Sequence, residues 1–285
     1  MIIILGKFES FHLGHQKLID VGKNLSKKLG LPLKILALNP LPYEVFFKNY
    51  IPIYTPEERR HIAENKFLTS LDFLDFRKIK DLKPLEFLKF LKINYNFKYI
   101  VVGKDFFFGK NRQGSYLDLK KYENILNYKA ILVDLEKVYK EKISTSKIRN
   151  LLKEGKIDIA NKYLNHFYFL FGKVIKGSQV GRKLGFPTAN ISCKKLLLKR
   201  GVYKVYIYIK EDFLSFKAIA NFGKKPTFGE NKDILEVHIP NVKLNLYGKN
   251  VIVWFEKFIR EEKKFKSLEE LKKQIEKDIR ELEKD

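Results

Sequence analysis

The chain has 285 residues, enough for two ordinary domains, and a globular composition with 45% hydrophobic and 14% aromatic residues. Its one cysteine, Cys193, excludes an intrachain disulfide and fits the cytoplasm, where we expect the protein to work. The net charge of +24 would suit a nucleic-acid-binding protein, but the lysines are spread along the whole chain, so we expect nucleic acid not to be the main partner.

Apolar runs of strand length alternate with helical patterns through the first half of the chain. The runs at residues 1–5, 33–38, 99–103 and 130–134 predict strands that are buried on both faces. The first run is far too short to cross a membrane, so we expect no membrane association. Helices are predicted after His15, from a capping box at residues 55–58, and from Pro84 to Leu91. This alternation predicts a Rossmann-like α/β domain with a doubly wound parallel sheet.

The pattern changes in the second half. Residues 144–149 predict the start of a helix that ends near Gly155, and a short helix follows at 157–164. Runs rich in β-branched and aromatic residues then recur between turns, at residues 169–175, 202–209, 216–221, 234–239 and 251–258. They predict a small Greek-key β-barrel, followed by an amphipathic C-terminal helix that Ser267 caps. We place the domains at residues 1–166 and 167–285.

Two histidines follow the first predicted strand, at the point where a helix begins. The first N–H groups of a helix favour an anion, and the imidazoles of His12 and His15 add hydrogen-bond donors. Gly14 between them removes a side chain where a phosphate would approach. The pattern therefore predicts a phosphate site, although two histidines that only cap a helix would give the same spacing.

A second helix start, at residues 144–149, carries three hydroxyls, a lysine and an arginine. These groups would hold the outer phosphates of a triphosphate, and an ordinary N-cap is the alternative. The run from Gly103 to Gly109 follows another predicted strand, on the side of the sheet where such folds bind ligands. Its three phenylalanines, Phe106 to Phe108, face the core or a planar ligand, and we expect at least two of them to face the core.

The segment at residues 181–190 predicts another phosphate site, in the second half of the chain. Its glycines allow close approach of the backbone, and Thr188 and Asn190 present a hydroxyl and a carboxamide two residues apart. Glu236 lies between apolar neighbours on a predicted strand, either as a base or on a solvated face. Arg260 and Phe265 would hold a flat aromatic ligand, or would be a surface arginine and a packing phenylalanine.

Together these residues resemble the bacterial bifunctional riboflavin kinase/FAD synthetase family, over nearly the whole chain and in the family's order. The first half is similar to its adenylyltransferase module, an HxGH nucleotidyltransferase, through residues 6–8, 12–15, 101–109 and 144–149. The second half is similar to its riboflavin kinase module, most specifically through residues 181–190 and then through 201–203, 221–228 and 246–248.

The resemblance implies that the second domain uses ATP to phosphorylate riboflavin to FMN. It implies that the first domain then adenylylates FMN to FAD and releases pyrophosphate. The implied partners are riboflavin, FMN and ATP, with Mg²⁺ as the metal, and the oligomeric state is left open.

The resemblance also implies a role for each candidate residue. The catalytic residues would be Glu236 as base, with His12, His15 and Arg149. Contacts to ATP or its phosphates are implied for Gly6, Phe8, Gly14, Ser144, Thr145, Ser146, Lys147, Gly177, Gly181, Lys183, Pro187, Thr188 and Asn190. Flavin contacts are implied for Asp105, Phe106, Phe108, Asn221, Arg260 and Phe265, and metal contacts for Thr188 and Asn190.

The first half departs from the family pattern at a few positions. The family usually has Asp-Gly where this chain has Glu9 and Ser10, and a histidine where it has Leu41. These departures leave open a riboflavin kinase whose first domain is inactive. An alternative of another class is a basic protein that binds nucleic acid.

Overall fold

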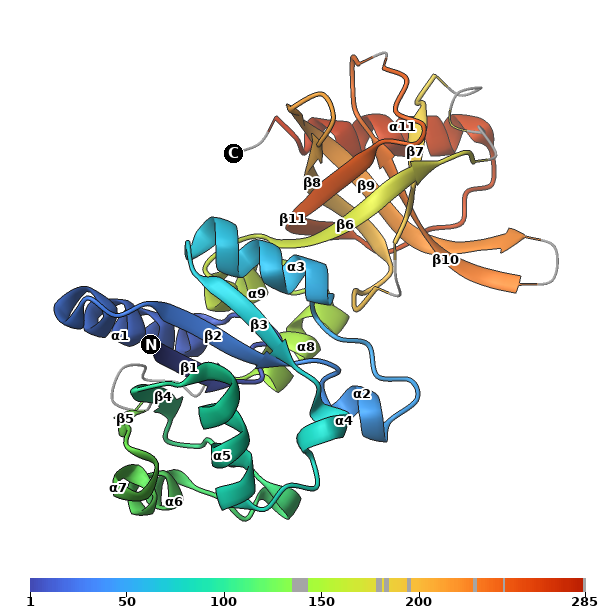
Figure 1. The fold of residues 1–285 in the computed structure, drawn as a ribbon. Coiled ribbons are helices and arrows are strands. Elements are labelled where there is room, and N and C mark those ends of the chain that lie inside the picture. The colour runs from blue at the N-terminus through green and yellow to red at the C-terminus, as the bar shows by residue number, and fades with distance from the viewer. Residues whose placement is uncertain are drawn as a thin grey trace. The chain divides into compact units, whose positions relative to one another are not determined.

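The computed structural model describes residues 1–134, 143–177, 181, 185–193, 196–227, 230–242 and 244–283 (Figure 1). Lys183, predicted to contact phosphate, lies outside the described residues. The chain divides into two compact units, residues 1–145 and 146–285, and each is described by itself. No helix in the described ranges is long and apolar enough to cross a membrane.

A parallel sheet forms the centre of the first unit. In the described part of the chain it has five strands in the order β3-β2-β1-β4-β5. Their bounds are β1 Ile2–Gly6, β2 Leu33–Leu38, β3 Ser70–Leu74, β4 Tyr99–Gly103 and β5 Lys129–Val133. The doubly wound α/β prediction is therefore confirmed. The order reverses between β1 and β4, and the loops after these two strands meet at the edge where such sheets bind ligands.

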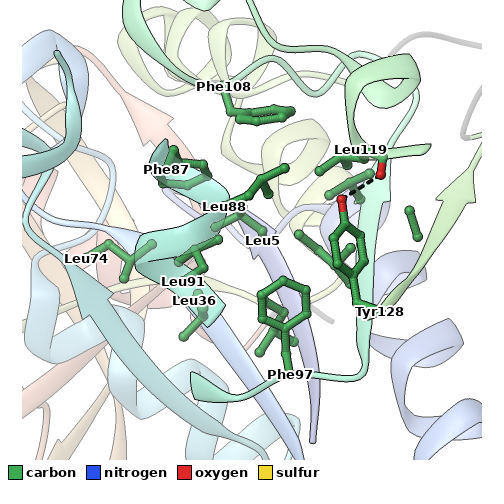
Figure 2. Close-up of a cluster of buried hydrophobic side chains, with 14 of the residues drawn as sticks. Leu5, Leu36, Leu74, Phe87, Leu88, Leu91, Phe97, Phe108, Leu119 and Tyr128 are labelled. Atoms are coloured by element: carbon green, nitrogen blue, oxygen red, sulfur yellow. Dashed lines mark hydrogen bonds between the residues drawn. The ribbon is translucent and has the colours of Figure 1, made fainter. Parts of the chain in front are cut away.

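Helices cover both faces of this sheet. Helix α1 (Leu13–Leu29) packs on the face of Ile4, because a Cβ on Gly22 would lie 2.7 Å from the Ile4 side chain. Helix α5 (Pro84–Tyr95) supplies Phe87, Leu88 and Leu91 to a hydrophobic cluster with Leu5 on the opposite face (Figure 2). Shorter helices complete the unit: α2 Pro42–Phe46, α3 Pro56–His61, the π-helix η1 Ile62–Lys66, α4 Phe76–Ile79, the 3-10 helix η2 Lys110–Arg112, α6 Tyr116–Lys121 and α7 Glu123–Leu126.

The second unit is built on a closed antiparallel barrel. Its described strands, in the order β10-β7-β6-β11-β8-β9, confirm the predicted barrel. Their bounds are β6 Tyr168–Ile175, β7 Thr188–Ser192, β8 Gly201–Ile209, β9 Leu214–Thr227, β10 Glu230–His238 and β11 Asn250–Arg260. Helix α11 (Leu268–Arg280) follows, capped by Ser267 as predicted. Leu282 and Ile279 pack on Val202 and Ile219, outside the barrel.

Two helices precede the barrel, α8 (Thr145–Glu154) and α9 (Ile157–Leu164), close to their predicted bounds. Helix α9 packs on the barrel because the buried Asn161 carboxamide donates to the Phe255 carbonyl and accepts the Tyr168 N–H. The compact units therefore divide before these helices, whereas we predicted a boundary at residue 166, just before β6. Whether residue 166 also separates the two activities stays a prediction.

Candidate active sites

The loop after β1 is held by a buried arginine. Arg59 of α3 is 1% exposed and donates hydrogen bonds to the carbonyl oxygens of Lys7 (2.6 Å), Phe8 (2.9 Å) and Leu38 (2.9 Å). Burial lowers its pKa to about 10, so the guanidinium stays charged at neutral pH. Phe8 has a φ of 46°, a conformation that costs energy for a non-glycine residue and needs such support. Arg59 thus joins the ends of β1 and β2.

His12 and His15 lie together where this loop enters α1. Their rings stack with centroids 4.0 Å apart, and the His15 N–H donates to His12 Nδ1 at 3.4 Å. Burial lowers the pKa of His12 to about 4 and that of His15 well below its ordinary value. Both rings are therefore neutral at pH 7. Because Nδ1 of His12 accepts a hydrogen bond, its proton is on Nε2, which can donate to a ligand.

Other residues expected to contact ATP lie next to these histidines or support their rings. Phe8 is fully buried and its ring lies 4.8 Å from that of His15, so it supports the histidine. Gly6 ends β1 and Gly14 is buried in the first turn of α1. The hydroxyls of Ser10 and Thr145 lie 3.3 Å apart, so Thr145 lies beside the loop after β1.

The loop after β4 brings a carboxylate near the histidines. Asp105 is exposed, and its negative charge partly offsets the lowering of the His12 pKa. Phe106 and Phe108 stack with centroids 5.7 Å apart and pack against the core, while Phe107 is exposed. The prediction that at least two of these rings face the core is confirmed. The flavin contacts expected of Asp105, Phe106 and Phe108 stay predictions.

The positions that depart from the family pattern are well accommodated. Glu9 is 2% exposed and accepts hydrogen bonds from the Tyr50 hydroxyl (2.8 Å) and the Ile53 N–H (3.2 Å). Leu41 is 1% exposed, and its N–H donates to the Glu44 carboxylate at 2.8 Å. Glu9 therefore ties the β1 loop to the segment before α3, and Leu41 belongs to the core.

The two basic residues in the first turns of α8, Lys147 and Arg149, belong to the second unit. Lys147 places its ammonium 4.6 Å from the centre of the Tyr163 ring of α9, where a cation–π contact holds it. Arg149 and Ser144 are half-buried, and Ser146 is exposed. Their phosphate contacts remain predictions.

The barrel aligns three of the predicted polar residues in one row. Glu236 of β10 is paired with Asn190 of β7 on one side and with Asn221 of β9 on the other. Directly paired residues share a face, and Leu235 and Val237 beside Glu236 are buried inside the barrel. Glu236, Asn190 and Asn221 therefore lie together on the outer face.

The glycines of the second site make room for its polar side chains. A Cβ on Gly177 would collide with the Asn190 carboxamide, and one on Gly181 would collide with the Phe186 carbonyl. The same added Cβ on Gly181 would lie 3.4 Å from Thr188 Oγ1, and the Phe186 N–H donates to the Gly181 carbonyl at 2.8 Å. The backbone at Gly177 and Gly181 thus lies close to Asn190 and Thr188, and its predicted approach to a ligand stays a prediction.

The predicted aromatic-ligand pair lies at the end of β11. The Arg260 guanidinium carbon is 6.0 Å from the centre of the Phe265 ring. The same guanidinium also donates to both carboxylate oxygens of the buried Asp278, at 2.9 and 2.6 Å. Arg260 therefore fastens α11 to the barrel, and its flavin contact remains a prediction.

The donors of the second site suit a hard divalent cation. The Thr188 hydroxyl, the Asn190 carboxamide oxygen and the Glu236 carboxylate are all oxygen ligands of the kind such cations prefer. Among the described residues, no group of three or more His, Cys, Asp or Glu side chains forms a metal cluster.

The sequence reasoning missed Arg59 and His238. Arg59 stands beside Arg60 in a charged helix start, and nothing in the sequence marks which of the two is buried. His238 shares the outer face with Glu236, and strand alternation was the signal that could have identified it.

Comparisons with known proteins match both halves of the chain. The FAD synthetase family model matches residues 1–147 and the riboflavin kinase model matches residues 164–284. The bifunctional riboflavin kinase/FMN adenylyltransferase of Buchnera aphidicola subsp. Acyrthosiphon pisum is 34% identical, with 98% of this chain and 91% of that protein covered. The protein of the same description from Bacillus subtilis is 33% identical, with 98% and 90% covered.

A solved structure resembles the whole chain. It is a crystal structure described as a macrolide-efflux protein from Streptococcus pneumoniae, with a TM-score of 0.88 and 30% identity. The match covers 99% of this chain and 93% of that one, and the efflux description concerns that protein alone.

Proposed function

Because the chain belongs to the bifunctional riboflavin kinase/FMN adenylyltransferase family, we propose that it makes FAD from riboflavin in two transfers from ATP. The barrel phosphorylates riboflavin to FMN, and the parallel-sheet domain adenylylates FMN to FAD with release of pyrophosphate. One observation carries the proposal: each family model matches a part of the chain that has a polar site of its own.

In the kinase step, the 5′-hydroxyl oxygen of riboflavin forms a bond to the γ-phosphorus of ATP. The bond from that phosphorus to the β–γ bridging oxygen breaks, and ADP leaves. Glu236 accepts the hydroxyl proton, and Asn190 and Asn221 beside it orient the reacting groups. A divalent cation, which we propose to be Mg²⁺ held by Thr188 and Asn190, would neutralise charge on the phosphates.

In the adenylyl step, a phosphate oxygen of FMN forms a bond to the α-phosphorus of ATP. The bond from that phosphorus to the α–β bridging oxygen breaks, and pyrophosphate leaves. The nucleophile is already an anion, so this step needs no base. The Nε2–H of His12, the His15 ring and the N-terminus of α1 stabilise the phosphoryl oxygens.

The two alternatives are not favoured. Glu9 and Leu41 suggested a protein with kinase activity only. Both residues are buried, however, and their polar groups form hydrogen bonds, so neither disrupts the fold of the first unit. A nucleic-acid-binding protein was suggested by the charge alone, which leaves both family matches unexplained. We also propose that the enzyme works in the cytoplasm.

A pair of single variants tests the assignment, and each is the control for the other. Glu236→Gln is expected to abolish FMN formation from riboflavin and to leave FAD formation from added FMN unchanged. His15→Ala is expected to suppress FAD formation and to spare FMN formation. Both products are measured by chromatography of the flavins. Full kinase activity in Glu236→Gln would remove that residue from the mechanism.

A further inference from the structure

His238 lies on the same face of β10 as the proposed base. It is two residues beyond Glu236 and is paired with Thr188, the first residue of β7. Its side chain is well covered, with the residue 8% exposed, and its ring meets that of Phe186 edge-on at 5.6 Å. The described contacts thus place an imidazole beside the residues expected to hold phosphate.

The imidazole makes a directed hydrogen bond to the backbone before β7. His238 Nδ1 lies 2.8 Å from the Pro187 carbonyl oxygen. A carbonyl only accepts, so Nδ1 carries the proton. Burial lowers the pKa of His238 and outweighs the opposite effect of this hydrogen bond, so the ring is neutral at pH 7.

Pro187 stands where the β7–β10 ladder ends. The pairing of the two strands stops at Thr188 and His238, and a proline has no N–H with which to extend it. The His238 side chain instead donates a hydrogen bond to the carbonyl of the same proline. It therefore fixes the peptide that leads into Thr188 and, two residues on, into Asn190.

We propose that His238 is a positioning residue of the kinase site. It ties the segment that bears Thr188 and Asn190 to the strand that bears Glu236, and so sets the distance between the phosphate-holding groups and the base. This inference rests on the proposed kinase function and deepens it. His238 itself is assigned no proton transfer.

Matched variants separate positioning from simple packing. His238→Leu fills a similar volume but removes the N–H that donates to Pro187. His238→Asn keeps an N–H near the position of Nδ1. Val237→Ala is the control, because Val237 is buried inside the barrel on the same strand and so faces away from His238. Rates of FMN formation are measured with ATP and riboflavin varied, and FAD formation from added FMN is the internal standard.

We expect the loss of the His238 hydrogen bond to affect ATP more than riboflavin. His238→Leu should lower kcat for FMN formation on the order of 10- to 100-fold and raise the KM for ATP more than that for riboflavin. His238→Asn should restore most of kcat. Wild-type kcat in folded His238→Leu, or an equal loss in Val237→Ala, would overturn the inference. A wild-type protein that makes no FMN would instead refute the proposed function.

A measurement without catalysis covers the case in which His238→Leu does not fold. The ¹⁵N spectrum of histidine-labelled wild-type protein, with the His238 signals assigned by their loss in His238→Asn, reports the tautomer. The Nδ1–H form at pH 7 is expected, because Pro187 accepts from it. The Nε2–H form would mean that the hydrogen bond is absent, and would overturn the inference.

Discussion

Replacing Arg59 by methionine should unfold the first unit much more readily and leave the barrel intact. Methionine occupies a similar length but donates no hydrogen bond to the carbonyls of Lys7, Phe8 and Leu38. It also removes the positive charge that stabilises the buried Glu9 carboxylate, whose charge in turn raises the Arg59 pKa.

The expected cost is about 3–5 kcal/mol, because three carbonyl groups lose a charged donor at roughly 1–3 kcal/mol each. That is a large share of the stability of an ordinary domain, which is about 5–15 kcal/mol. FAD formation should fall with it, because the loop that carries His12 loses its anchor. FMN formation should be unchanged.

The chain provides a way to follow the two units separately. Its one tryptophan, Trp254, lies in β11 of the barrel, so tryptophan fluorescence in urea reports the second unit. Far-UV circular dichroism reports both units. In Arg59→Met the circular dichroism transition should begin at lower urea while the fluorescence transition stays in place. Arg59→Lys, which keeps the charge but not the planar fork, should be intermediate. Identical circular dichroism transitions in wild type and Arg59→Met would refute the reasoning.

Two further predictions concern the first unit. The pKa of His12 is about 4 in the folded state, below its unfolded value of about 6.5. Between these two pH values only the unfolded state binds the proton, so the free energy of unfolding is highest above about pH 6.5 and decreases as pH falls towards 4. This is worth at most about 3 kcal/mol, and urea unfolding of His12→Gln should show a shallower loss than wild type between pH 7 and 4.5. Glu9→Asp should weaken the hydrogen bonds to Tyr50 and Ile53, costing the first unit about 1 kcal/mol and lowering FAD formation, although aspartate is usual in the family. Faster FAD formation in Glu9→Asp would contradict this.

Much of the fold follows from local sequence patterns. The buried parallel strands, the capping box of α3, the Ser267 cap of α11 and the bounds of α9 could all be predicted from hydrophobic spacing and cap residues. Two strands could not. β3 is an edge strand with a charged residue, Asp72, in its centre, and β7 is short and begins directly after a proline.

The residues of the sites could be identified as candidates, but their grouping could not be predicted. The row of Asn190, Glu236 and Asn221 depends on the register of strands far apart in the sequence. The roles of Arg59 and Glu9 depend on burial, which a charged residue does not reveal locally. Arg260 was a candidate for ligand binding because of its charge. Its hydrogen bonds to Asp278 could not be predicted, because that partner lies on a helix whose position only the fold determines.

The most direct test of the account is a time course of the purified chain with riboflavin, ATP and Mg²⁺, with the flavins separated by chromatography. The account predicts that FMN appears first and is then converted to FAD, with pyrophosphate released in step with FAD. FMN that accumulates without FAD would contradict the assignment of the first unit. Riboflavin that remains unchanged would contradict the account as a whole.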